Sequence, residues 1–236
     1  MKPKFLLSVL WLVTVGLAVA QKASPEHPPA SQDELKQVLA QMNHAAAGFK
    51  SAKADFQFDY YTKAVDEHDI QKGQIYCRRS GKDVDVAINV VSPVPKTVLY
   101  KDEKVSLYEP RIDQVTEKSV GKSKADVDAV LNLGFGGSGD ELVKSFDVAM
   151  EGWETVDGVK TARLHLVGKS DDLKKLFTKA ILWVDPERDV PLKQQFFEST
   201  GDYRLNHYTA IVLSTKLSND IFRLKTTSKT KFVRPQ

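Results

Sequence analysis

Apolar positions recur at helical spacing in one segment, residues 31 to 49. Ser31 and Glu34 match the capping box, a Ser/Thr-x-x-Glu pattern that starts helices. The apolar residues that follow fall three and four positions apart: Leu35, Val38, Leu39, Met42, Ala45, Ala46 and Phe49. This spacing predicts one amphipathic helix that begins after Ser31 and buries a single face.

From Ala54 onward the period of the pattern changes to two. Phe56, Phe58 and Tyr60 alternate with polar residues, which is typical of a half-buried strand. Similar patterns predict further strands at 75–79, 83–90, 98–100, 105–108, 147–153, 161–167, 180–185, 191–198, 203–213 and 221–224. Polar turns join these segments, so we expect an antiparallel meander and not parallel βαβ units.

Short helical segments interrupt the meander. Ser123 can cap a helix that carries Val130 and Leu131 on one side, and two shorter helices are predicted at 140–146 and 172–177. A sheet of about ten strands tends to curl or close, and apolar helices must lie on its concave face or cap its open end. The pattern therefore predicts one α+β domain built on a long, curved antiparallel sheet.

The first twenty residues have the features of a signal peptide. Lys2 and Lys4 precede an apolar run over residues 5–17, which is shorter than the roughly 20 residues that span a membrane. Ala18-Val19-Ala20 supplies the small residues of a cleavage site. We therefore predict a signal peptide at residues 1–20, a proline-rich disordered leader at 21–30, and one domain over 31–230.

Composition excludes several classes of protein. The formal net charge is +3, which is too small for a protein that binds nucleic acid by neutralising many phosphates. A single cysteine, Cys77, cannot form an internal disulfide. We expect an exported, nearly neutral protein that does not bind nucleic acid.

No sequence motif predicts catalysis or metal binding. Gly134 to Gly139 matches the G-x-G-x-x-G dinucleotide pattern, but the residues before it look helical, which favours a helix C-cap followed by a flexible loop. The five histidines are at least seventeen residues apart, so they form no local zinc pair. Asp185 and Asp189 are typical of a turn around Pro186. We therefore expect no catalytic residue, metal or cofactor, and an enzyme acting through His165, His207 or Asp185 is the least favoured alternative.

One charged residue is out of place in the strand pattern. Arg79 has the same parity as Ile75 and Cys77, so its side chain points to the inner face if theirs do. A buried guanidinium needs carbonyl or carboxylate partners. The alternative is that Arg79 lies at the strand end and reaches water.

The order of these features resembles the outer-membrane lipoprotein carrier family, which we call LolA-like, over roughly residues 33 to 226. The matching segments, in chain order, are Ala47-Gly-Phe-Lys-Ser-Ala-Lys-Ala-Asp-Phe56, Gly73-Gln-Ile-Tyr-Cys-Arg-Arg79, Val98-Leu-Tyr-Lys-Asp-Glu-Lys-Val105, Leu107-Tyr-Glu-Pro-Arg-Ile-Asp-Gln-Val115, Leu133-Gly-Phe-Gly-Gly137, Val156-Asp-Gly158, Ile181-Leu-Trp-Val-Asp185 and Gly201-Asp-Tyr203. The sequence departs from the family pattern at Ser80, where proline is usual, and at Ser106, where an aromatic residue is common.

The resemblance implies an unclosed antiparallel β-barrel of about eleven strands, covered by helices that act as a lid. It also implies a monomeric periplasmic carrier that shields the acyl chains of lipoproteins, or a diacyl lipid, between an inner-membrane donor and an outer-membrane acceptor. Arg79 matches the arginine that holds the lid closed, with residues 127–135 as part of the lid. The candidate residues of the cavity and lid are Phe56, Phe58, Tyr60, Ile75, Arg79, Val98, Leu107, Val130, Leu131, Phe135, Leu164, Leu166 and Phe196.

Two other functions use the same fold expectation. The first is a periplasmic module that senses lipid or lipoprotein and regulates a protein partner without transferring cargo. The second is a scaffold whose interior is filled by side chains, as in small barrels generally.

Overall fold

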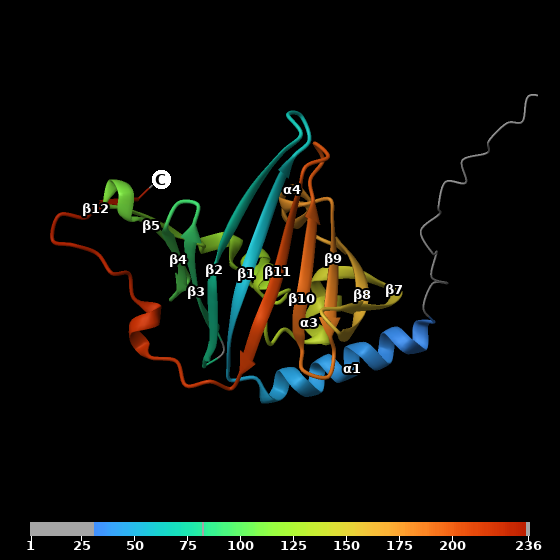
Figure 1. Cartoon of the computed structure of the whole chain (residues 1–236). Coiled ribbons are helices and arrows are strands. Elements are labelled where there is room, and N and C mark those ends of the chain that lie inside the picture. The colour runs from blue at the N-terminus through green and yellow to red at the C-terminus, as the bar shows by residue number, and fades with distance from the viewer. Residues whose placement is uncertain (1–30, 82, 235–236) are drawn as a thin grey trace, which may run out of the picture.

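The computed structural model describes residues 31–81 and 83–234 (Figure 1). The predicted signal peptide and leader, residues 1–30, lie outside the described residues. Four α-helices accompany the sheet within the described part of the chain: α1 (Gln32–Gly48), α2 (Lys124–Leu131), α3 (Gly139–Ser145) and α4 (Asp171–Leu176).

A single large sheet carries the fold, and its fold class is the predicted α+β, unclosed antiparallel barrel. Its twelve strands are β1 (Ser51–Thr62), β2 (Glu67–Ser80), β3 (Asp83–Ser92), β4 (Lys96–Lys101), β5 (Lys104–Glu109), β6 (Gln114–Ser119), β7 (Phe146–Val156), β8 (Val159–Gly168), β9 (Lys179–Asp185), β10 (Val190–Phe197), β11 (Tyr203–Leu213) and β12 (Lys231–Val233). Their order is β12-β6-β5-β4-β3-β2-β1-β11-β10-β9-β8-β7, so β12 and β7 are the two edges. Every pairing is antiparallel except that of β12 with β6.

The predicted amphipathic helix is confirmed as α1. The Ser31 hydroxyl accepts from the Glu34 amide, and the Glu34 carboxylate accepts from the Ser31 amide, which completes the capping box. Val38, Met42 and Ala46 form its buried face. In Figure 1 this helix runs across one end of the sheet, beneath the turn between β9 and β10.

The antiparallel pairings give the sheet two distinct ends. Residues 63–66, 93–95 and 198–202 are turns at one end, which we call the hairpin end, and α4 lies there too. The turns at 157–158 and 186–189 lie at the opposite end beside α1, which we call the α1 end. A molecule that enters between the sheet and α2 from the hairpin end therefore moves toward α1.

The prediction of a strand at residues 221–224 is wrong. Asn219–Phe222 is a 3₁₀-helix, capped by the Ser218 hydroxyl accepting from the Asp220 amide. Phe222 is buried under the guanidinium of Arg78, 4.1 Å from its ring centroid. This cap and this burial favour a single helical turn. The last strand of the described chain is instead β12, an edge strand that lies beyond the predicted domain end at residue 230.

Buried apolar side chains form two clusters along the sheet. The first extends over β1–β4 and β11 and onto parts of β7, β9 and β10, and it includes Phe56, Ile75 and, from the segment after α2, Phe135. The second joins α1, α3 and α4 to β7–β10 and includes Leu164 and Leu166. The side chains of α1, α3 and α4 thus cover much of the inner face of β7–β10, so a cavity forms more readily toward β1–β3 and β11.

Candidate functional site

A cavity of about 380 Å³ lies between the concave face of the sheet and the segment from α2 to Phe135. Its walls come from β1, β2, β3, β10 and β11, from α2 and α4, and from the residues that follow these two helices. The lining residues are Phe58, Tyr60, Ile75, Cys77, Val84, Val86, Ile88, Val130, Leu131, Gly134, Phe135, Leu176, Phe177, Gln194, Phe196, Arg204, Asn206 and Tyr208. Most of these side chains are apolar, so the cavity favours an apolar occupant.

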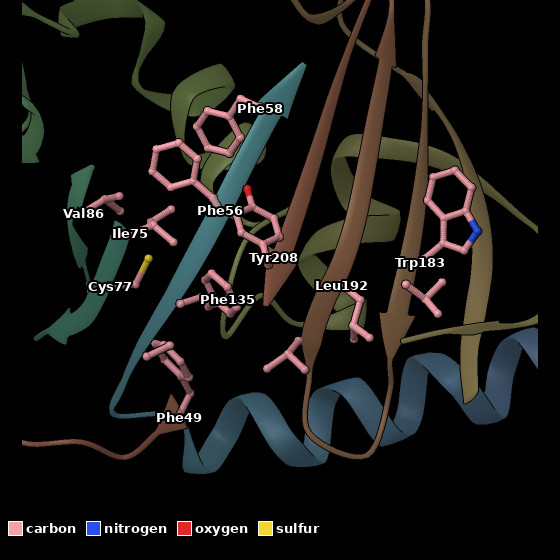
Figure 2. Packing of buried hydrophobic residues seen from close by; sticks show 14 of the residues in the cluster. Phe49, Phe56, Phe58, Ile75, Cys77, Val86, Phe135, Trp183, Leu192 and Tyr208 are labelled. Atoms are coloured by element: carbon pink, nitrogen blue, oxygen red, sulfur yellow. The ribbon is translucent and has the colours of Figure 1, made fainter. Parts of the chain in front are cut away.

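Aromatic rings form the deep wall of the cavity. The ring of Phe135 packs edge-on against Tyr208, with 5.2 Å between centroids, and Tyr208 packs edge-on against Phe58 at 6.1 Å. Figure 2 shows Phe135 between Tyr208 and Phe49, with Ile75 and Cys77 beside it. Burial raises the pKa of the Cys77 thiol to about 12, so this side chain stays neutral and behaves as a small apolar group.

A buried glutamine fastens the residues after α2 to the sheet. The Gln194 side-chain amide donates to the Leu133 carbonyl, while its oxygen accepts from the Tyr208 hydroxyl at 3.0 Å and the Asn206 amide at 3.2 Å. Burial raises the pKa of Tyr208, which therefore remains a neutral donor. All these groups are satisfied within the interior, so the polar cluster anchors the covering segment without leaving an unpaired donor there.

Arg79 lies at the end of β2, outside the cavity, and contacts three backbone carbonyls. Its Nη2 donates to Ala46 at 3.5 Å and to Gly136 at 3.3 Å, and its Nε donates to Phe49 at 3.4 Å. The guanidinium also lies 5.8 Å from the centre of the Phe49 ring. Ala46 and Phe49 end α1, so one cation joins the C-terminus of α1 to the segment that follows α2. Two alternatives were predicted for Arg79, an inward side chain with carbonyl partners and a side chain at the strand end that reaches water. Each is met in part, because Arg79 has the inward parity of Cys77 and binds carbonyls, yet it remains exposed at the strand end.

The segment after α2 makes close backbone contacts that only glycine permits. Gly136 has φ +77°, and a Cβ there would lie 2.3 Å from the Phe49 ring. The Asn132 side chain closes the turn, donating to the Ser138 carbonyl at 3.2 Å and accepting from its amide at 3.0 Å. The segment therefore follows a helix and packs tightly against α1, which agrees with a helix C-cap and not with a dinucleotide motif. We call α2 together with residues 132–138 the lid.

Asp189 is a buried acid beside this contact. Its residue exposure is 2%, and its Oδ2 has no hydrogen-bond partner among the residues that the structure describes. Burial raises the pKa of its carboxyl to about 8, and the positive charge of Arg79 opposes that rise. Its backbone carbonyl accepts from the Gly136 amide at 3.5 Å. The turn between β9 and β10 thus holds a third contact to the lid.

Seven of the candidate residues predicted from the sequence line the cavity together: Phe58, Tyr60, Ile75, Val130, Leu131, Phe135 and Phe196. Phe56 does not line the cavity, but its ring stacks on that of Phe58, with 3.9 Å between the centroids. These residues come from β1, β2, β10 and the lid, so the structure joins four separated segments at one site.

The remaining candidates lie elsewhere. Val98 and Leu107 are on the same face of the sheet as Ile88, by direct register across β3, β4 and β5, but they lie beyond the cavity wall. Leu164 and Leu166 are fully buried in the second cluster, because the side chains of α1, α3 and α4 cover that half of the sheet. They hold the helices in place and do not line the cavity.

Gln194, Asn206 and Arg204 line the cavity but were missed by sequence reasoning. A signal was present for the first, since Gln194 has the same strand parity as Phe196 and is polar on an otherwise inward-facing row. Nothing in the pattern of β11 distinguishes the other two from ordinary surface residues.

No family model and no curated protein matches this sequence. Solved structures do match. A conserved protein of Thermus thermophilus has 11% identity, covers 86% of this chain and 99% of its own, and has a TM-score of 0.56. MucB has 14% identity, covers 87% of this chain and 67% of its own, and has a TM-score of 0.54. A LolA superfamily protein of Nitrosomonas europaea matches at 14% identity over 80% of this chain and 97% of its own, with a TM-score of 0.40.

The chain has the fold of MucB and of the Thermus thermophilus protein. At 11–14% identity these similarities establish the shared fold alone. Within residues 31–81 and 83–234, no group of three or more His, Cys, Asp or Glu side chains could hold a metal ion. None of the helices in the same residues is both long enough and apolar enough to span a membrane.

Proposed function

We propose that the protein is a periplasmic carrier that holds the acyl chains of lipoproteins, or of a diacyl lipid, beneath its lid. The observation that carries the proposal is the apolar cavity on the concave face, covered by Val130, Leu131 and Phe135 of the lid. Binding, and not catalysis, is the activity that this cavity supports. On this proposal the chain acts as a monomer that takes cargo from an inner-membrane donor to an outer-membrane acceptor.

The energetics of acyl-chain binding suit such a cavity. Each methylene removed from water contributes about 0.8 kcal/mol, so burying eight of them stabilises the complex by about 6 kcal/mol. Cargo must also leave, so the empty state cannot be much less stable than the loaded one. A lid that packs its own apolar residues onto the sheet when the cavity is empty competes with cargo and makes release possible.

Arg79 is the residue whose change tests the lid most directly. The Arg79→Leu variant loses the contacts that join the Gly136 carbonyl of the lid to the Ala46 and Phe49 carbonyls at the end of α1. These contacts are long and partly solvated, so we expect the closed lid to lose about 1–2 kcal/mol. A less stable lid opens more often, and a bound fluorescent acyl probe should exchange several-fold faster in stopped-flow measurements. Arg223→Leu is the matched control, because Arg223 is exposed, pairs only with Asp220 among the described residues, and lies near Tyr76 on the opposite face of β2. Equal exchange rates in the two variants would contradict the role of Arg79.

Cargo itself is tested with protein purified from the periplasm without detergent. Native mass spectrometry with lipid extraction should detect a diacyl lipid or an acylated peptide, and added lipoprotein should form a soluble complex. A clean apo mass together with failure to bind added lipoprotein would refute the proposal.

The alternative is a sensor that binds lipid and regulates a protein partner. It is favoured by the fold shared with MucB, which has been solved in a complex with MucA from Pseudomonas aeruginosa. The two functions differ in one measurement. A carrier transfers labelled lipoprotein from one membrane to another, whereas a sensor binds lipid without transfer and stays in a stable complex with its partner.

A further inference from the structure

Arg204 is the only charged side chain among the described residues that line the cavity. It lies near the start of β11, directly opposite Tyr60 on β1 and Phe196 on β10, and both of these also line the cavity. Its side chain therefore projects to the concave face, with its guanidinium 5.7 Å from the centre of the Phe196 ring.

Arg204 lies at the mouth of the cavity. Tyr60 and Leu176 are lining residues that are 36% and 49% exposed, whereas Phe135 and Cys77, deeper in the cavity, are only 4% and 5% exposed. Tyr60 and Leu176 both belong to the hairpin end, and the Arg204 Nη2 donates to the Leu176 carbonyl at 3.2 Å. An acyl chain that enters from this end places its headgroup beside Arg204.

The guanidinium of Arg204 has unused capacity to donate. Arginine carries five N–H donors, and Arg204 makes one hydrogen bond within the described part of the chain. Its Nε is buried without a hydrogen-bond partner there, and the Glu198 carboxylate, 3.3 Å away, forms an ion pair with it outside hydrogen-bond geometry. A buried donor without a partner is costly, so the site gains when an acceptor with better geometry arrives.

We propose that the cavity is selective for amphiphiles with an anionic headgroup, a carboxylate or a phosphate, and that Arg204 is the residue that confers this selectivity. The inference rests on the proposed function, since it assumes that an acyl chain occupies the cavity. A carboxylate or a phosphate matches the fork geometry of a guanidinium and replaces Glu198 as its partner. A neutral headgroup leaves the buried Nε with only the Glu198 carboxylate, which lies outside hydrogen-bond geometry.

The test compares three ligands with the same sixteen-carbon chain: hexadecanoate, hexadecyl phosphate and hexadecanol. Each displaces N-phenyl-1-naphthylamine, a neutral fluorescent probe, from the full mature protein below the ligand's micelle concentration. We expect at least one anion to bind about tenfold more tightly than the alcohol, the size of one charge-assisted hydrogen bond. The two anionic arms distinguish carboxylate from phosphate recognition.

In Arg204→Gln the affinity for the two anions should fall to the affinity for hexadecanol. The affinity for hexadecanol itself should equal that of the unchanged protein. Arg223→Gln, at an exposed site remote from the cavity, should keep the full preference for anions. A preference that survives in Arg204→Gln, or that is absent from the unchanged protein, overturns the inference.

Two further results separate the possible failures. If none of the three ligands displaces the probe, the proposed acyl-chain function itself fails. If Arg204→Gln no longer binds hexadecanol either, the variant has lost its cavity, and the inference is then tested with Glu198→Gln. Removing the carboxylate that competes for Arg204 should tighten anion binding several-fold and leave hexadecanol unchanged, and unchanged anion binding there overturns the inference.

Discussion

The contact between Gly136 and Phe49 allows a quantitative test of how the lid is held against α1. Gly136 has φ +77°, and a Cβ added to it would lie 2.3 to 2.8 Å from three atoms of the Phe49 ring. Gly136→Ala therefore carries two separate costs. The left-handed backbone costs about 1–2 kcal/mol for a residue with a Cβ, and the steric overlap costs about 1–3 kcal/mol.

A second glycine separates these two costs. Gly158 has φ +79°, and an added Cβ there meets no atom within 4 Å. Gly158→Ala thus carries only the cost of the backbone conformation, about 1–2 kcal/mol. We expect Gly136→Ala to lower the free energy of unfolding by about 2–5 kcal/mol, measured by urea denaturation, and Gly158→Ala to lower it by the smaller amount.

A double-mutant cycle with Phe49→Ala completes the argument. Phe49 is 8% exposed, so its truncation alone should cost about 3–5 kcal/mol. In the double variant the overlap between the added Cβ at position 136 and the Phe49 ring is gone. The loss of unfolding free energy in the double variant should therefore be smaller than the sum of the two single losses by about 1–3 kcal/mol. Equal losses for the two glycine variants, or strict additivity in the cycle, would refute the view that this ring fixes the lid.

Two further predictions concern the other contacts of the lid. Gln194→Leu leaves the Leu133 carbonyl and the Tyr208 hydroxyl without their buried partner, so the free energy of unfolding should fall by about 2–4 kcal/mol in urea titrations. Gln195→Leu, on the opposite face of the same strand, should have little effect, and similar losses in both would contradict the assignment. Asp189 has a pKa raised by burial to about 8 from an ordinary value of 3.8, so the folded state retains a proton that the unfolded chain releases between these values. Stability should therefore fall as pH rises through that window, and Asp189→Asn should flatten the decline in urea midpoints between pH 5 and pH 8. An unchanged pH dependence would show that another group dominates.

The fold could be predicted in large part because its signals are local. The capping box at Ser31 and the helical spacing after it define α1, and the alternation from Phe56 to Tyr60 defines β1. Each of these patterns depends only on neighbours in the chain. The strand β12 has no such signal, because three residues pairing in parallel with β6 depend on a partner more than a hundred residues away.

The candidate site was predicted less completely, for a geometric reason. Strand parity says which face of the sheet a side chain occupies, but not which part of that face a helix covers. Leu164 has the same inward parity as Phe58, yet the helices cover it and leave Phe58 at the cavity. The polar lining residues Gln194 and Arg204 depend on the same long-range arrangement, because their roles come from the Leu133 and Leu176 carbonyls.

The contacts of the lid also suggest where it opens first. Gln194 and Arg79 both bind backbone carbonyls of the lid, at Leu133 and Gly136, on either side of Phe135. The bond from Gln194 is buried and belongs to a satisfied polar cluster, so breaking it exposes several groups at once. The bond from Arg79 to Gly136 is 3.3 Å long and only partly buried, so water can replace it at a lower cost than the buried bond from Gln194. Opening should therefore begin at Gly136, with the Gln194 contact broken last, and amide hydrogen exchange should be faster at Gly136 than at Gly134.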